Sequence, residues 1–178
     1  MSKINRNNQA QEIIWNFLLD HAGEKFYLTQ IARQTNLSDS TVHQILESQV
    51  ERNLIKKEKL GNLSFYSLDK SHPAIKLKKQ LRTIFLIQPL INQLKEWSQK
   101  IILFGSAALG EDTSSSDIDL LIISKEKDKI YEIFSKAKIK NKVKLIVKNF
   151  LEWSKIKQKD KFFYEQINKG KVLWDSHE

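Results

Sequence analysis

The chain has 178 residues, contains no cysteine and carries a formal net charge of +9 at pH 7. The lack of cysteine excludes disulfides and thiolate metal sites, and no apolar run approaches the roughly twenty residues that a membrane-spanning helix needs. We therefore expect a soluble, cytoplasmic protein without a membrane partner, long enough for two small domains. The positive charge favours polyanions, either nucleic acid or a nucleoside triphosphate.

The first part of the chain predicts three helices. Apolar residues recur at helical spacing in three successive ranges, 9–21, 29–37 and 39–52. Thr29 is the expected cap of the second helix, and Ser38 is the expected cap of the third. The first exposed turn of the third helix carries polar side chains that could bond to phosphates or base edges: Ser40, Thr41, His43 and Gln44.

A hairpin is predicted next. Residues 54–60 and 63–68 read as two strands, and Gly61-Asn62 between them suits a tight turn. The order of three helices and a hairpin, with residues 28–47, resembles the winged helix-turn-helix domain of small bacterial and archaeal regulators. The resemblance implies that the helix from Ser38 enters the major groove of double-stranded DNA. It also implies wing contacts to the DNA backbone from Lys57, Lys59, Asn62 and Ser64.

The DNA-binding interpretation has alternatives. Winged helices also serve as protein-interaction or dimerisation modules. The charges of this part of the chain nearly cancel, so a homodimer would be needed for useful affinity for DNA.

A boundary is expected near Pro73, which suits the first turn of a helix. The helix should continue to about residue 88, where Pro89 interrupts or restarts it. The helix presents a wider apolar surface than one small domain needs. We therefore interpret its first half as a connecting or dimerising helix and its second half as the opening helix of a second domain. We therefore predict a winged helix-turn-helix domain at 1–72, a linker helix at 73–88 and a second domain at 89–178.

The most informative stretch is 101–123. Ile101 to Phe104 reads as a buried strand, and Gly105-Ser106 then permits close approach of a ligand such as phosphate. Asp117 and Asp119 lie at i and i+2 at the head of a second apolar run, so a strand would point both carboxylates to one face. Two carboxylates that close repel each other unless a cation lies between them, and Mg²⁺ with nucleotide phosphates meets that need.

Strand, Gly-Ser, ten residues, Asp-Ile-Asp and strand together resemble the signature of the DNA polymerase beta type nucleotidyltransferase superfamily. In particular, the stretch resembles the minimal nucleotidyltransferases and their relatives, which include the aminoglycoside nucleotidyltransferases. The resemblance implies that Gly105 and Ser106, with Ser116 nearby, hold the triphosphate of ATP or another NTP. It further implies that Asp117 and Asp119 are catalytic and bind Mg²⁺ or Mn²⁺. The alternative is a hairpin whose aspartates cap a polar loop.

The chain departs from the superfamily at one position. The superfamily supplies a third carboxylate from the next strand, expected here at Lys142 to Val147, and Lys144 stands near the expected place of that carboxylate. Its ammonium could pair with Asp117 or Asp119 or touch the triphosphate, and a solvated lysine is the alternative. Other carboxylates could substitute for the missing group: Glu111, Asp112, Glu152 and Asp160.

The remaining elements complete an α+β fold with a small mixed sheet and flanking helices. A helix at 127–138, a polar lysine-rich stretch after Trp153, a helix around 162–169 and a last strand at 171–175 are expected.

Two functions follow from these observations. The first is metal-dependent transfer of a nucleoside monophosphate from an NTP to an unknown acceptor by an enzyme tethered to DNA. The second, favoured by the missing carboxylate, is a transcription regulator whose nucleotidyltransferase-like domain binds nucleotide without reacting. A partner protein, such as the toxin of a toxin and antitoxin pair, is a third possibility.

Overall fold

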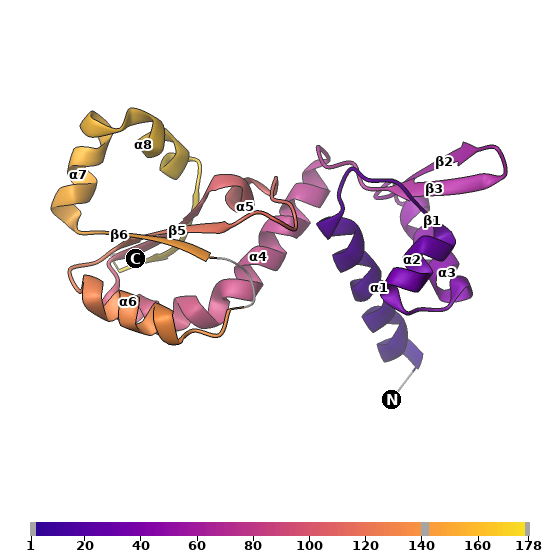
Figure 1. Cartoon of the computed structure of the whole chain (residues 1–178), viewed down its shortest axis with the longest axis horizontal. Coiled ribbons are helices and arrows are strands. Elements are labelled where there is room, and N and C mark those ends of the chain that lie inside the picture. Colours follow the sequence, from indigo (N-terminus) through magenta and orange to yellow (C-terminus); the bar gives the residue numbers. More distant parts are fainter. Residues whose placement is uncertain (1–2, 140–142, 177–178) are drawn as a thin grey trace. The chain divides into compact units, whose positions relative to one another are not determined.

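The computed structural model describes residues 3–139 and 143–176 (Figure 1). The contacts within the chain divide it into two compact units, Met1–Lys76 and Leu77–Glu178, called here the N-terminal and C-terminal units. Each mixes helices with one small sheet, so the fold is α+β. No helix among the described residues is long and apolar enough to span a bilayer.

The N-terminal unit contains the three expected helices, α1 (Lys3–Asp20), α2 (Leu28–Thr35) and α3 (Asp39–Glu51). Ser38 caps α3 as predicted, because its Oγ accepts a hydrogen bond from Thr41 N at 3.3 Å. Thr29 does not cap α2. The helix begins one residue earlier, where Gln30 Oε1 accepts from Tyr27 N at 3.0 Å.

The sheet of the N-terminal unit has three antiparallel strands in the order β1-β3-β2. The expected hairpin is formed by β2 (Lys56–Leu60) and β3 (Leu63–Ser67), and Gly61 takes the left-handed φ of +60° that its turn requires. The short β1 (Phe26–Tyr27) was not predicted, since two residues carry no periodicity. The helices bury an apolar stripe that includes Ile14, Leu18, Ile31 and Leu46.

A single helix, α4 (Pro73–Leu94), replaces the two helical segments expected around Pro89. It begins at Pro73, as predicted, but it does not stop at Pro89. Proline removes one helical hydrogen bond, yet the residues around it are held by the core. Ile87, Leu90 and Leu94 are almost fully buried, so their packing keeps the helix continuous.

The sheet of the C-terminal unit is mixed, with strand order β6-β5-β4-β7. Its strands are β4 (Lys100–Phe104), β5 (Ile118–Ile123), β6 (Val143–Lys148) and β7 (Lys171–Asp175). β5 and β6 run parallel, and the other neighbours are antiparallel. The expected first residue of β6, Lys142, lies outside the described residues.

Helices cover both faces of this sheet (Figure 1). One face packs on α4, the short α5 (Gly105–Leu109) and α6 (Lys127–Lys136), and the 3₁₀ helix η1 (Lys95–Trp97) precedes β4. The opposite face packs on α7 (Phe150–Lys159) and α8 (Lys161–Asn168) through Trp153, Phe163 and Ile167. The lysine-rich polar stretch expected after Trp153 is helical and belongs to α7.

Candidate functional site

Two aspartates and a lysine meet at one end of the second sheet. Asp117 immediately precedes β5 and Asp119 is its second residue, aligned with Phe104 of β4 and Lys144 of β6. Lys144 Nζ lies 2.6 Å from Asp117 Oδ2. Because side chains alternate along a strand, Asp119 and Lys144 share the face that α7 and α8 cover further along.

Gly105 lies against this group and must be glycine. Its φ is +71°, in the left-handed region, and a Cβ built on it would stand 2.5 Å from Asp119 Oδ2. The expected loop at Gly105-Ser106 is instead the start of α5, and Gly110, with φ +69°, follows its last residue. The backbone of β4 and α5 therefore approaches the Asp119 carboxylate closely.

The charges of the three side chains are coupled. Burial raises the pKa of the Asp119 carboxyl, while Lys144 lowers it and Asp117 adds to the rise. The hydrogen bond and charge of Asp117 raise the pKa of the Lys144 ammonium above its ordinary value. Lys144 is therefore protonated at neutral pH, and it supplies positive charge rather than a base.

The family model described as Polymerase beta, Nucleotidyltransferase matches residues 87–178. The chain belongs to this nucleotidyltransferase family. A solved structure of a candidate nucleotidyltransferase from Sulfolobus solfataricus is 18% identical, with a TM-score of 0.41, and the match covers 61% of this chain and 94% of that one. No curated protein matches the chain in sequence.

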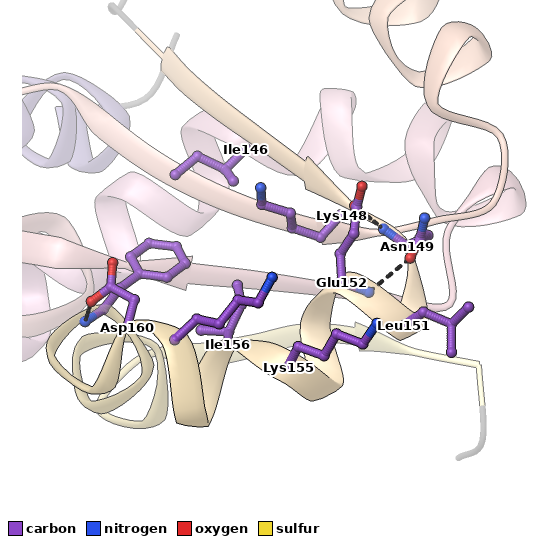
Figure 2. A pocket seen from close by; sticks show the side chains of 10 residues that line it. Ile146, Lys148, Asn149, Leu151, Glu152, Lys155, Ile156 and Asp160 are labelled. Atoms are coloured by element: carbon purple, nitrogen blue, oxygen red, sulfur yellow. Dashed lines mark hydrogen bonds between the residues drawn. The ribbon is translucent and has the colours of Figure 1, made fainter.

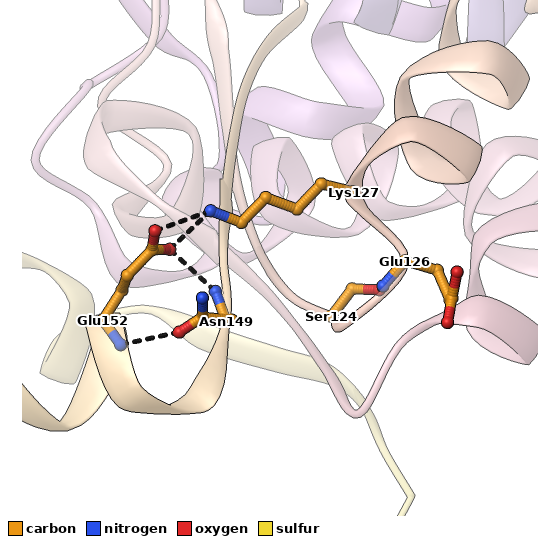
Figure 3. Close-up of polar contacts among 5 residues, drawn as sticks. All are labelled: Ser124, Glu126, Lys127, Asn149 and Glu152. Carbon is orange, nitrogen blue, oxygen red and sulfur yellow. Dashed lines mark hydrogen bonds and ion pairs between the residues drawn. The ribbon is translucent and has the colours of Figure 1, made fainter.

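The carboxylates offered as substitutes for the third family acid have other partners. Both oxygens of Glu152 accept from Lys127 Nζ, at 2.7 and 2.6 Å, and Glu152 Oε2 also accepts from Asn149 N (Figure 3). Asp160 Oδ1 accepts from Phe163 N at 2.9 Å and caps α8. These two residues hold helices in place, and their role as substitutes for the third carboxylate stays a prediction.

Asp112 is held by a lysine that sequence analysis missed. Lys79 of α4 is almost fully buried, donates to the Asp112 carbonyl and lies 3.7 Å from Asp112 Oδ1. Glu111 donates its backbone N–H to Ser106 O at 2.9 Å. In the sequence, a buried lysine on an amphipathic helix cannot be told apart from the solvent-exposed lysines around it. No sequence pattern therefore predicted that Lys79 is buried.

Ser116 is tied to the loop that leads into Asp117. Its Oγ accepts from Thr113 N at 2.9 Å, and its N–H donates to Thr113 O at 3.0 Å. Among the described residues no group of three histidines or carboxylates could hold a metal ion. The two carboxylates Asp117 and Asp119 are of the kind that holds one divalent cation together with substrate phosphates, and Lys144 pairs with Asp117 beside them.

The residues proposed to contact DNA all lie in the N-terminal unit. His43, Gln44, Lys59 and Asn62 are exposed. The hydroxyls of Ser38, Ser40 and Thr41 hydrogen-bond to one another at the start of α3. Lys57 Nζ lies 2.7 Å from Glu47 Oε1 of α3 and 5.7 Å from the Tyr66 ring centroid, so its charge is largely neutralised.

Proposed function

We propose that the C-terminal unit binds a nucleoside triphosphate with Mg²⁺ or Mn²⁺ at Asp117 and Asp119 and transfers its nucleoside monophosphate to an acceptor hydroxyl. The observation that carries this proposal is the approach of two carboxylates, one lysine ammonium and the Gly105 backbone at the end of one sheet. Membership of the nucleotidyltransferase family supports it.

The transfer forms a bond between the acceptor oxygen and the α-phosphorus. The bond from that phosphorus to the bridging oxygen breaks, pyrophosphate leaves with that oxygen, and the hydroxyl proton passes to solvent. A bound divalent cation supplies charge stabilisation to the phosphate oxygens. In this chain Asp117 and Asp119 hold the cation, and Gly105 and Ser106 hold the phosphates.

Lys144 has a defined role in this proposal. The superfamily places a carboxylate where Lys144 stands, and that carboxylate helps to hold a second cation. The Lys144 ammonium lies 2.6 Å from Asp117 and carries a fixed positive charge there. We infer that this charge replaces the second cation and interacts with the triphosphate, since phosphoryl-type transfer depends mostly on positioning and charge neutralisation.

Calorimetry of ATP binding tests the proposal, with Mg²⁺ in one titration and a chelator in the other. Binding that requires Mg²⁺ supports the carboxylate site and directs the search to the acceptor. Binding that persists in the chelator indicates that Lys144 alone neutralises the phosphates and that the unit senses nucleotide. No binding of ATP or of any other triphosphate refutes the proposal.

The variant Lys144→Asp separates the two roles of this position. It introduces the third carboxylate that the family carries, so transfer should rise at high Mg²⁺ and depend more steeply on its concentration. The control Lys144→Gln removes the charge without adding a ligand, and it should lower transfer at every Mg²⁺ concentration. A Lys144→Asp protein as inert as Lys144→Gln would contradict the assignment.

A second candidate function concerns the N-terminal unit. We propose that this unit is a winged helix-turn-helix that binds double-stranded DNA, with α3 in the major groove and the β2–β3 hairpin as the wing. The order α1-α2-α3-β2-β3 and the exposed His43 and Gln44 support this proposal. If the C-terminal unit binds nucleotide without transfer, the protein is a nucleotide-responsive regulator. Failure to shift any duplex at low salt in a mobility assay would refute DNA binding.

A further inference from the structure

A cavity of about 620 Å³ lies between β6 and the helices α7 and α8, within the size range of small-molecule sites. Its lining combines apolar side chains and lysines with two carboxylates, Glu152 and Asp160 (Figure 2). We refer to the apolar lining residues Ile146, Ile156 and Phe163 as its floor, and to the lysines Lys148, Lys155 and Lys159 as its rim. We call this cavity the lysine pocket.

The lysine pocket continues the face that carries the two aspartates. Ile146 stands two residues beyond Lys144 on β6, so the two side chains leave the strand on the same face, about 7 Å apart. Phe163 packs edge-on against Phe104, with ring centroids 5.6 Å apart. Phe104 is aligned with Asp119 in the sheet, so the pocket floor reaches the neighbourhood of the carboxylates.

The positive charge of the pocket is available to a ligand. Its two carboxylates have partners already, because Glu152 accepts from Lys127 and Asn149 while Asp160 caps α8. Lys148, Lys155 and Lys159 make no ion pair with any carboxylate among the residues that the structure describes. Three lysines therefore line a cavity in which none of them is held in an ion pair with a described carboxylate, and Lys148 acts on the nearby Glu152 only by lowering the pKa of its carboxyl.

The distribution of charge over the chain agrees with this arrangement. Residues 77–178 contain twenty lysines and arginines against thirteen carboxylate side chains, whereas residues 1–76 contain ten against eight. Most of the net positive charge thus belongs to the unit with the carboxylate site, where it favours an anionic ligand.

We propose that the lysine pocket holds the acceptor of the transfer, and that this acceptor carries a phosphate group close to its reacting hydroxyl. Lysine ammonium groups bind phosphate as mobile point charges, and the apolar floor receives an uncharged sugar or ring. The inference rests on the proposed function for the identity of the reaction. The phosphate belongs either to a small phosphate ester or to the backbone of an RNA end.

Calorimetry with two probes tests the pocket and separates these sources. Ribose 5-phosphate represents the small ester, and a short RNA with a free 3′ hydroxyl represents the RNA end. Both are titrated into protein saturated with Mg²⁺ and a non-hydrolysable ATP analogue, so that the triphosphate site is occupied. Binding of the sugar phosphate points to a small ester, and binding of the RNA alone points to an RNA end.

The decisive variant is K148Q/K155Q/K159Q. Its matched control, K157Q/K169Q/K171Q, removes the same charge from exposed lysines of the same unit outside the pocket. Loss of three charged contacts should weaken the bound probe about tenfold or more in the pocket variant and about twofold or less in the control. The affinity for Mg²⁺ and ATP should be unchanged in both, and circular dichroism checks the folding of each.

Three results would overturn the inference. They are no binding of either probe to the unmodified protein, equal weakening in the two triple variants, and a matching loss of ATP affinity in the pocket variant. A matching loss of ATP affinity in the pocket variant would indicate that the cavity binds the nucleotide instead of the acceptor. If the phosphate probe binds in the pocket but ATP does not bind with Mg²⁺, the proposed function fails while the phosphate site stands.

Discussion

The hairpin of the N-terminal unit and the α7 face of the C-terminal unit both carry several lysines, but their surroundings differ. Lys56 Nζ lies 2.8 Å from Asp69 Oδ2, and Lys57 Nζ lies 2.7 Å from Glu47 Oε1. In the lysine pocket, no described carboxylate pairs with the three lysines of the rim. The carboxylates near them are used by Lys127, Asn149 and Phe163.

This difference teaches that the number of lysines does not locate an anion site. A lysine that already neutralises a carboxylate gains little from a phosphate, because the new contact replaces an old one. A lysine without a carboxylate partner gains the full attraction to a phosphate, because no existing ion pair has to be broken. Local pairing therefore favours the C-terminal unit over the hairpin as the place where this protein binds anions.

The largest effect on stability is expected at Lys79. Lys79→Met leaves the partly buried Asp112 carboxylate without its cation, and should cost about 3 kcal/mol of unfolding free energy. The matched change Lys56→Met removes an ion pair whose lysine side chain is 61% exposed, and should cost about 1 kcal/mol or less. Urea unfolding of each variant measures the difference, and equal small losses would show that burial does not govern these pairs.

Helix caps give the next largest effect. Asn149→Ala removes the cap of α7, and Ser38→Ala removes the cap of α3. Each should cost about 1 kcal/mol of stability, with the larger loss at Asn149, whose Oδ1 accepts from Glu152 N at 2.8 Å, whereas Ser38 Oγ accepts from Thr41 N at 3.3 Å. Thermal unfolding of the two variants measures which cap contributes more to stability. A larger loss for Ser38→Ala than for Asn149→Ala would contradict this prediction.

A smaller effect is expected on DNA affinity. Lys57 is held by Glu47, whereas Lys59 is exposed and has no ion pair among the described residues. Lys59→Gln should therefore weaken duplex binding roughly two- to threefold and lower the salt slope by about one, while Lys57→Gln changes both less. Fluorescence anisotropy over a range of salt concentrations compares them. A larger loss for Lys57→Gln would show that its ion pair opens on DNA.

The smallest effect is a titration on α6. Lys136 and Lys129 lower the pKa of the exposed Glu132 from 4.5 to about 2. Because the pKa is lower in the folded chain, the resulting stability is present above pH 4.5 and is lost as the pH falls toward 2. Carboxyl NMR titration should find the low pKa, and Lys136→Gln should raise it. An ordinary pKa in the unmodified protein would show that solvent screens this cluster.

Sequence periodicity was sufficient for much of the fold. Alternation and apolar runs located the hairpin and the strands β4 and β5, and the i, i+2 spacing placed Asp117 and Asp119 at the head of β5. The register of β6 followed from its alternation, so the approach of Lys144 to Asp117 was expected as one of several alternatives. The structure confirms the contact at 2.6 Å.

Other features depend on tertiary contacts that a single sequence does not display. The lysines from 155 to 159 hid the helix α7, for which the sequence predicted only a lysine-rich polar stretch, although Asn149 and Glu152 form its capping box and Ile156 is buried. Pro89 suggested a helix break, which the buried Ile87 and Leu90 prevent. The pairing of Lys79 with Asp112 joins residues 33 positions apart, beyond the reach of any periodic pattern.

The central claim is that Asp117 and Asp119 hold a metal nucleotide. Calorimetric titration of ATP in Mg²⁺ into Asp117→Asn, Asp119→Asn and the control Asp128→Asn tests it most directly, since Asp128 is an exposed carboxylate of α6 in the same unit. We predict that binding weakens by about a hundredfold or more in the two site variants, because each removes a charged metal ligand, and that the control binds like the unmodified protein. Retained binding in both site variants, with the fold intact by circular dichroism, would contradict the assignment of the site.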